Sequence, residues 1–482
     1  MKKITVMLVL TALVLGLCAC STNNTGESTA PTQSFDCFVV GYSRVNITPT
    51  ESVPMDGYGN TSMRMSKEED HEAWDDLYST CIAFTDAENN TVLLFQNDLQ
   101  YAYSSVTLEA RNAISQATGV PVENIMVAGT NTHSAPAIDN TAEPSIVRYR
   151  ASLKEWMVQA AKEALADRKP AKMYTGTTEV KKLSFVRHYT LDNGGIKGDN
   201  FGTYLTGTIT GHTHDADNLM QLVKFTREGG QDVLLVNWQC HPSRGGGREK
   251  YNITSDIVGV MRATVEESAN CLFAYYTGAS GNVNPSSWIP KENITSNYPA
   301  QGKAIAKYAI KALDTLQEAE TGKVQILGKM YTGTVNHTED HLLEKAEEVV
   351  ARWTETNDRD ACNLMAYEYG MNSVYHATGV INKAAMGETA NVEMYAFSIG
   401  EVAFVTAPYH MFDVNGKQIR EQSPFGTTFV VTCCNDNLGY IPSAEAYGYN
   451  CFEANYGTFA AGTGEILVEQ YVALLSQLHS AK

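Results

Sequence analysis

The sequence predicts an α/β protein with a mixed sheet at its core, helices packed on that sheet, and catalytic loops at the carboxyl ends of the strands. Two observations support this prediction. Short runs rich in β-branched and aromatic residues alternate along the chain with amphipathic stretches of helical period. In addition, five of the β-like runs lead directly into loops that contain histidine, tyrosine or glycine.

The first residues have the charge layout of a secretory signal. Lys2 and Lys3 precede the uncharged run ITVMLVLTALVLG, which is too short for a comfortable membrane span. The run leads into LCAC at residues 17–20, which is typical of a bacterial lipoprotein cleavage box and predicts Cys20 as the lipid-modified first residue of the mature chain. A noncleaved anchor is the alternative. Both interpretations place the protein in the cell envelope, at a membrane and facing outside the cytoplasm.

A tether and one large globular body are expected after the signal peptide of residues 1–19. Residues 20–35 contain almost no apolar side chain to bury, so they predict a flexible tether. From residue 36 to residue 482 no charge block, repeat or second hydrophobic span interrupts the chain. This stretch is therefore predicted to be a single body.

The elements of that body follow from their periodicity. The runs STCIAFTD (79–86) and TVLLFQN (91–97) predict a strand pair, because both are rich in branched and aromatic residues and a turn-like AENN separates them. Residues 105–119 predict a helix closed by Gly119. Further helices are expected where apolar residues recur at helical spacing, at 145–167, 256–269, 301–318 and 341–353.

Composition excludes one class of partner. The net charge of −18 and the pI of about 5.1 repel phosphate backbones, so nucleic acid is not expected to bind. A small molecule, a lipid or a glycan remains possible as substrate. Eight cysteines lie beyond Cys18 and Cys20, and they leave disulfides and buried free thiols equally open: Cys37, Cys81, Cys240, Cys271, Cys362, Cys433, Cys434 and Cys451.

The five loops at strand ends hold the candidate site residues. These are Asn131 and His133 after ENIMVAGT, His241 after DVLLVNWQC, Gly278 at the end of CLFAYYTG, His410 after EVAFVTAP, and Tyr440 after TTFVVTCC. Side chains from different strands converge at such ends. Neutral imidazoles and an anionic oxygen are what zinc requires, and a position left open on the metal takes a water whose pKa falls to about 7. The loops therefore predict one zinc ion.

A second histidine cluster offers a rival metal site. His212 and His214 in GHTHDAD are two residues apart and would share one face of a strand, with Asp215 and Asp217 adjacent. Exposed polar residues are common in loops, so a solvated loop is the expected interpretation. No His-Glu-x-x-His helix occurs in the chain, which excludes the common metalloprotease arrangement.

A set of short motifs resembles the catalytic domain of the neutral/alkaline non-lysosomal ceramidase family and its bacterial relatives. The motifs, in family order, are VGYSRVNITP, MDGYGN, TNTHSAP, NWQCHP, ITSDIVG, TGASGNVNP, APYHMF and LGYIPSAEAY. They extend the resemblance from about residue 38 to about residue 477. It implies a divergent lipoprotein member of that family, without the C-terminal immunoglobulin-like domain.

The resemblance also implies a zinc site, with departures. His241 and Tyr440 match two family ligands, whereas His410 stands where the family has a glutamate and Asn131 where it has a histidine. His133 matches a catalytic or hydrogen-bonding histidine. One imidazole is lost and one gained, so a rearranged metal site is expected, in which Asn131 ligates through its carbonyl or His133 moves in. A site without metal is the competing interpretation.

Two more positions carry over from the family. Gly278 stands where ceramidases have a serine, so the resemblance implies a different substrate, and residues 278–281 are expected to offer backbone N–H groups to an oxyanion or a sugar hydroxyl. A tight turn that closes a strand is the alternative. Arg187 matches a pocket arginine that could clamp a carboxylate, phosphate or carbonyl.

The expected function is that of a zinc-dependent, lipid-anchored hydrolase that cleaves an amide or ester bond with activated water. His133 is expected to act as acid or base, and Tyr440 as ligand and charge stabiliser. Ceramide itself is doubtful as substrate, since the family's serine is missing at Gly278. The alternative function is a noncatalytic lipoprotein that keeps the pocket to bind a ligand.

Overall fold

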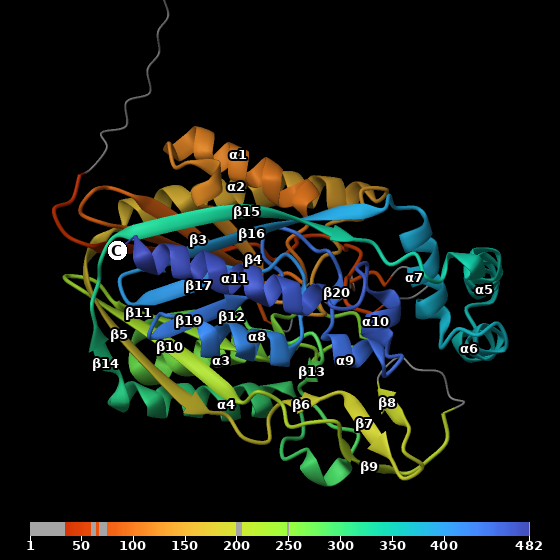
Figure 1. Ribbon diagram of the computed structural model, residues 1–482. Coiled ribbons are helices and arrows are strands. Elements are labelled where there is room, and N and C mark those ends of the chain that lie inside the picture. The colour runs from red at the N-terminus through yellow and green to blue at the C-terminus, as the bar shows by residue number, and fades with distance from the viewer. Residues whose placement is uncertain (1–33, 59–63, 67–74, 199–204, 248–249, 482) are drawn as a thin grey trace, which may run out of the picture. The chain divides into compact units, whose positions relative to one another are not determined.

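The computed structural model describes residues 34–58, 64–66, 75–198, 205–247 and 250–481 (Figure 1). Phe35–Lys482 forms one compact unit. The predicted signal peptide, Cys20 and nearly all of the predicted tether lie outside the described residues. Within the described ranges, no helix is both long and apolar enough to cross a membrane.

A nine-stranded mixed sheet forms the larger part of the core. Its strand order is β12-β11-β10-β5-β1-β2-β3-β4, with β14 paired to β5. The pairs β3–β4 and β11–β12 are parallel and the other pairs antiparallel. The bounds are β1 (Val39–Asn46), β2 (Tyr78–Thr85), β3 (Thr91–Asn97), β4 (Ile125–Gly129), β5 (Lys169–Glu179), β10 (Leu219–Arg227), β11 (Asp232–Trp238), β12 (Cys271–Thr277) and β14 (Gln317–Ala319).

A second sheet and three small ones complete the strands. The second sheet has the order β15 (Val324–Thr334), β16 (Thr389–Ile399), β17 (Val402–Thr406), β19 (Thr427–Val431), and β17 and β19 are parallel. The small sheets are β6 (Phe185–Val186) with β13 (Val283–Asn284), β7 (His188–Leu191) with β8 (Ile196–Gly198) and β9 (Ile209–His212), and β18 (His410–Met411) with β20 (Tyr440–Ile441).

The two large sheets share one apolar core, and helices cover their outer faces. Phe84 and Tyr276 of the first sheet meet Phe397, Phe404 and Phe429 of the second, and the rings of Phe397 and Phe404 stack with centroids 4.4 Å apart. Three helix pairs pack outside: α1 (Ser104–Thr118) and α2 (Pro144–Ala166) on β1 to β4, α3 (Asp256–Ala269) and α4 (Tyr298–Ala312) on β10 to β12, and α8 (Asp413–Gln422) and α11 (Thr463–Ser480) on the second sheet (Figure 1). The predicted α/β class with a mixed sheet is confirmed.

A further helical lobe follows β15 in the chain and returns to β16. It contains α5 (Leu343–Thr356), α6 (Arg359–Glu368) and α7 (Val374–Ala384) around an apolar cluster of their own (Figure 1). Two short helices, α9 (Ala444–Tyr447) and α10 (Phe452–Tyr456), follow β20, and α10 packs on α7. We call residues 335–388 the helical lobe.

Several predicted elements match the observed ones. The expected strand pair is the antiparallel pair β2–β3, and α1 ends at Gly119, whose φ of 78° lets its N–H reach the Ser115 carbonyl at 2.8 Å. The prediction of a helix over 301–318 is wrong at its C-terminal end. Helix α4 stops at Ala312, and residues 317–319 form β14 on the edge of β5 because Leu316 is already extended.

The carboxyl ends of several strands meet at one place because the first sheet curls. Strands β1 and β5 pair over only two residue positions, so the sheet bends there and brings β12 near β4. Thr277 Oγ1 donates to the Thr130 carbonyl at 2.7 Å, and the Gly129 N–H donates to the Cys433 carbonyl at 3.0 Å. The Thr432 N–H donates to the Thr277 carbonyl at 3.0 Å. The ends of β4, β12 and β19 are thereby tied together.

Candidate functional site

A cavity of about 970 Å³ is lined by loops that follow these strand ends. His133, His241, His410 and Tyr440 all line it, although they come from four separate segments. His133 follows β4 and His241 follows β11. His410 and Tyr440 are direct neighbours in the parallel β18–β20 pair, which fixes their side chains beside each other.

The aromatic rings of these residues form a continuous row. The rings of His241 and His410 are stacked, with centroids 5.5 Å apart and planes 11° apart. The ring of Tyr440 lies 4.6 Å beyond His410 at 19°, and the ring of His133 meets the His241 ring edge-on at 5.5 Å. Residues separated by up to about 300 positions in the sequence are thus in contact at the base of one cavity.

The imidazoles at the cavity base are held neutral. Burial, with the positive charge of Arg187, lowers the pKa of His133 to about 3. Burial also lowers the pKa of His410 to about 3 and that of His241 well below its usual value. The protonated forms are disfavoured because the rings have lost their hydration and lie close to Arg187. Neutral imidazole is the form that binds a metal.

Two ring nitrogens of this row are buried without a hydrogen-bond partner among the described residues, which makes them candidate metal donors. Nδ1 of His241 lies 3.1 Å from the Val283 carbonyl, which selects the tautomer with a proton on Nδ1 and a lone pair on Nε2. Nε2 of His241 and Nε2 of His410 are both buried and have no hydrogen-bond partner among the described residues. A buried acceptor without a partner is costly, and a cation would satisfy it.

Asn131 occupies a strained position directly after β4. Its φ is 67°, in the left-handed region that asparagine tolerates better than most residues. The residue is fully buried, and both polar atoms of its side chain lack a hydrogen-bond partner in the described part of the chain. Asn131 does not line the cavity itself. It is therefore a buried amide with an unsatisfied carbonyl next to the cavity wall.

Arg187 lines the same cavity and also donates to three protein acceptors. Its Nε donates to Glu453 Oε1 at 2.5 Å, Nη2 to the Gly281 carbonyl at 2.8 Å and Nη1 to Asn284 Oδ1 at 3.4 Å. The guanidinium carbon lies 5.4 Å from the ring centroid of Tyr440. These contacts hold the 281–284 loop and Tyr440 in place, and the expected role of Arg187 as a substrate clamp stays a prediction.

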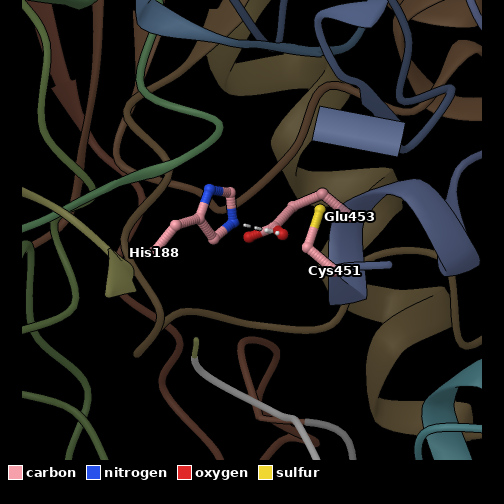
Figure 2. Close-up of side chains that lie close together, drawn as sticks. All are labelled: His188, Cys451 and Glu453. Carbon is pink, nitrogen blue, oxygen red and sulfur yellow. Dashed lines mark hydrogen bonds and ion pairs between the residues drawn. The ribbon is translucent and has the colours of Figure 1, made fainter. Parts of the chain in front are cut away.

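Glu453 lies at the centre of a buried polar group. Its second oxygen accepts from His188 Nε2 at 2.9 Å, and Cys451 lies close to both residues (Figure 2). Despite burial, the charge of Arg187 and the contact with His188 hold the pKa of Glu453 far below its usual value. The sequence did not indicate that Glu453 pairs with Arg187.

The group of His188, Cys451 and Glu453 could hold a metal by its geometry. Among the described His, Cys, Asp and Glu side chains, it is the one set of three whose donor atoms all lie within 4.8 Å of one another. However, both Glu453 oxygens are already bonded, and the Cys451 thiol donates to the Ala446 carbonyl at 3.4 Å. Burial raises the pKa of that thiol well above its usual value. We interpret the group as a support for Arg187.

The glycine loop does not supply the expected oxyanion donors. The Gly278 N–H donates to the Trp238 carbonyl at 2.9 Å, and the Gly281 N–H to the Met411 carbonyl at 2.7 Å. Both amides are used inside the fold, and neither glycine lines the cavity. A Cβ at Gly278 would lie 2.7 Å from Gln239 Oε1, so the Gln239 side chain would have to move to admit one. The alternative of a tight turn that closes β12 describes the loop.

The histidines of GHTHDAD belong to separate polar contacts. His212 lies 2.8 Å from Glu292 Oε2 and 2.6 Å from the Val186 carbonyl, whereas His214 lies 3.1 Å from Asp413 Oδ1. The solvated loop expected from the sequence is corrected, because both side chains contact a carboxylate and are partly buried. Their different partners also argue against a shared metal.

A loop near the N-terminus shapes the cavity wall at His133. Gly57 has a φ of 113°, and a Cβ there would lie 2.5 Å from the Cβ of His133. Asp56 beside it lines the cavity, and burial together with the charge of Asp139 raises its pKa to about 7. The MDGYGN motif was the only signal for this contact in the sequence.

All eight cysteines of the described residues are free thiols.

Comparison with known proteins supports the fold. The neutral ceramidase from Pseudomonas aeruginosa superposes with a TM-score of 0.68 at 14% identity, over 93% of this chain and 75% of that one. The solved structure of a ceramidase complexed with C2 gives a TM-score of 0.67 at 16% identity, over 92% of this chain and 76% of that one. No family model and no curated protein matches the sequence. The likeness therefore shows a ceramidase-like fold.

Proposed function

We propose that the protein is a metal-dependent hydrolase of an amide or ester bond, a divergent relative of the neutral ceramidases. The observation that carries the proposal is the row of neutral, buried imidazoles and a tyrosine at the base of a cavity, on a fold shared with neutral ceramidases. In the reaction, the acyl C–N or C–O bond breaks, the oxygen of water joins the acyl carbon, and a proton passes to the leaving group.

Zinc is the metal that fits the donors best. We assign Nε2 of His241, Nε2 of His410 and the Tyr440 hydroxyl as ligands, with the fourth position left for water. The carbonyl of Asn131, a residue that does not line the cavity, is kept as a further candidate ligand. The two unsatisfied imidazole nitrogens support this assignment. When bound, zinc would act as a Lewis acid that lowers the pKa of water and polarises a carbonyl.

The chain's own residues supply binding and proton transfer. His133, which lines the same cavity, is placed to accept a proton from water and return it to the leaving group. Arg187 holds Tyr440 in place and offsets negative charge that develops on the substrate oxygen. Glu453 fixes the orientation of Arg187 through a buried hydrogen bond.

Metal content tests the proposal. The protein purified without chelator is expected to hold about one zinc per chain. His241→Ala and His410→Ala should each lose most of that zinc and the hydrolysis of acyl amides and esters, whereas the control His341→Ala, an exposed histidine, should lose neither. Unchanged zinc in both alanine variants would contradict the assignment. Stable folding with no metal and no hydrolysis would favour a noncatalytic ligand-binding protein.

We also propose that the chain is anchored in the cell envelope through a lipid on Cys20, after removal of residues 1–19. Residues 20–35 would tether the catalytic body of residues 36–482 to the membrane, facing outside the cytoplasm. The LCAC box at residues 17–20 supports this proposal. Cys20→Ser should move the protein out of the membrane fraction, and retention of the variant there would contradict lipid anchoring.

A further inference from the structure

One wall of the cavity comes from the helical lobe. Six lobe residues line it: Trp353, Arg359, Asp360, Asn363, Tyr375 and Thr378. None of them has an aliphatic side chain. The rings of Trp353 and Tyr375 meet edge-on with centroids 5.6 Å apart, and the charged and amide groups of α6 flank them. An alkyl chain bound here would bury these polar groups without a hydrogen bond, which is unfavourable.

A second aromatic surface comes from outside the lobe. Trp288 also lines the cavity and remains 44% exposed. Its ring stacks on Tyr189 with centroids 5.2 Å apart and planes 7° apart, and its backbone N–H donates to the Tyr189 hydroxyl at 2.8 Å. Lys197 places its ammonium 5.9 Å from the same ring. Trp288 thus packs on Tyr189, carries the Lys197 ammonium over its ring, and still presents a large exposed aromatic surface to the cavity.

Carboxylates add hydrogen-bond acceptors to the rest of the lining. Asp56 and Asp139 lie in loops that precede the lobe in the sequence, and Asp360 lies on α6. The Tyr103 hydroxyl, which also lines the cavity, lies 3.4 Å from Asp56 Oδ2. Flat rings combined with carboxylate, amide and guanidinium groups complement a ligand that has both apolar C–H faces and several hydroxyls.

We propose that the acyl group is carried by a sugar, so that the substrate is an acylated saccharide rather than a two-chain lipid. The apolar face of the sugar ring would lie on Trp288, and its hydroxyls would bond to Asp56 and to Arg359 and Asp360 of the lobe. This inference rests on the proposed function, because it names the substrate of the same site. The inference adds that the group released when the acyl bond breaks is a sugar.

A matched substrate series tests the inference. N-acetylglucosamine oligomers, an N-acetylated alkylamine and a short-chain ceramide share the amide bond and differ in the group that carries it. With zinc present, kcat/KM is expected to be about tenfold or more higher for the sugar than for the other two, because a site with hydrogen-bonding groups rejects analogues that lack them. Trp288→Ala and Asp360→Asn should lower kcat/KM for the sugar about tenfold, mainly through KM.

Matched controls separate a local effect from a general one. Tyr367→Ala and Glu368→Gln change similar side chains on α6 that do not line the cavity, and they should leave all three rates unchanged. Equal or faster hydrolysis of the alkylamine or the ceramide would overturn the sugar inference and leave the hydrolase proposal intact.

Binding gives a second measurement that does not depend on turnover. Calorimetry is expected to detect binding of the N-acetylglucosamine oligomer to a His133→Ala variant. The added change Trp288→Ala should abolish that binding. If no acyl compound is hydrolysed by the parent protein, the proposed hydrolase function fails, and this measurement decides the sugar inference alone. Absence of oligomer binding would overturn it.

Discussion

At the scale of single residues, the site depends on close backbone approaches as much as on the histidines. Gly57 packs directly against His133, and no other residue type fits because a Cβ would lie 2.5 Å from the Cβ of His133. Asn131 occupies a left-handed conformation beside it. Strain of this kind persists only where the surrounding structure enforces it. The position of His133 is thus set from two sides.

The contact at Gly57 leads to a testable prediction. Gly57→Ala is expected to reduce the free energy of unfolding by about 3 kcal/mol and to displace His133, with a large loss of activity. Gly194→Ala is the matched control, since Gly194 also has a positive φ, 80°, but a Cβ there meets nothing within 4 Å. It should cost about 1 kcal/mol and leave activity unchanged. Equal effects in urea unfolding and activity assays would contradict the clash with His133.

The sequence predicted the members of the site better than their roles. The positions of His133, His241, His410 and Tyr440 directly after apolar runs predicted that they lie together, because side chains converge at strand ends, and all four line one cavity. The hydrogen bonds of the 278–281 amides could not be predicted, since their acceptors, the Trp238 and Met411 carbonyls, belong to other loops. Pairing of Arg187 with Glu453 spans 266 positions and likewise has no local signal.

At the scale of elements, the expected strands and helices were found, and the end of one helix was misplaced. The apolar runs of β2, β3, β4, β11 and β12 are nearly fully buried, so composition alone identified them. The end of α4 was misplaced because residues 317–319 have no apolar pattern and are held as a strand only by pairing with β5. Tertiary pairing overrides local preference at such short edges.

A contact between Glu339 and two side chains of α7 stabilises the helical lobe. Glu339, which precedes α5, lies 2.9 Å from His376 Nε2 and 3.3 Å from Lys383 Nζ, both on α7. Burial raises the pKa of Glu339, but the hydrogen bond with His376 and the charge of Lys383 outweigh it and lower the pKa from 4.5 to about 2. The folded state therefore favours the charged carboxylate more than the unfolded state does.

This contact predicts a pH dependence for the lobe. Because the folded pKa is depressed, the stabilisation is present above about pH 4.5 and is lost as pH falls towards about 2. Glu339→Gln should weaken protection of α7 amides in hydrogen exchange at pH 7 by about 1 kcal/mol, after discounting for partial exposure, and by less at pH 3. Glu347→Gln, an exposed change on α5, is the control. A deficit that grows towards low pH would contradict this sign.

At the scale of the whole molecule, the site exists because the large sheet bends back on itself. Strands β4 and β12 lie at opposite ends of the strand order, yet Thr277, the last residue of β12, donates to the carbonyl of Thr130, which follows β4. The second sheet joins the same point through Thr432 and Cys433. Assembly of the proposed metal donors therefore requires both sheets to close correctly, and we expect a defect in this junction to affect stability and metal binding together.

Thr277→Val tests this coupling. The substitution keeps the size of the side chain and the backbone bonds but removes the hydrogen bond of 2.7 Å to the Thr130 carbonyl, which is the residue before Asn131. Leaving that buried carbonyl without its partner should reduce the free energy of unfolding by about 1–3 kcal/mol and weaken zinc affinity.

Thr264→Val removes a bond of the same length, from Oγ1 to the Val260 carbonyl within α3, and so provides the matched control. It should cost a few tenths of a kcal/mol, roughly, and leave zinc affinity unchanged. Unfolding in urea and competitive zinc titration would measure both effects, and an equal zinc affinity in the two variants would show that the junction of the strand ends does not control the metal site.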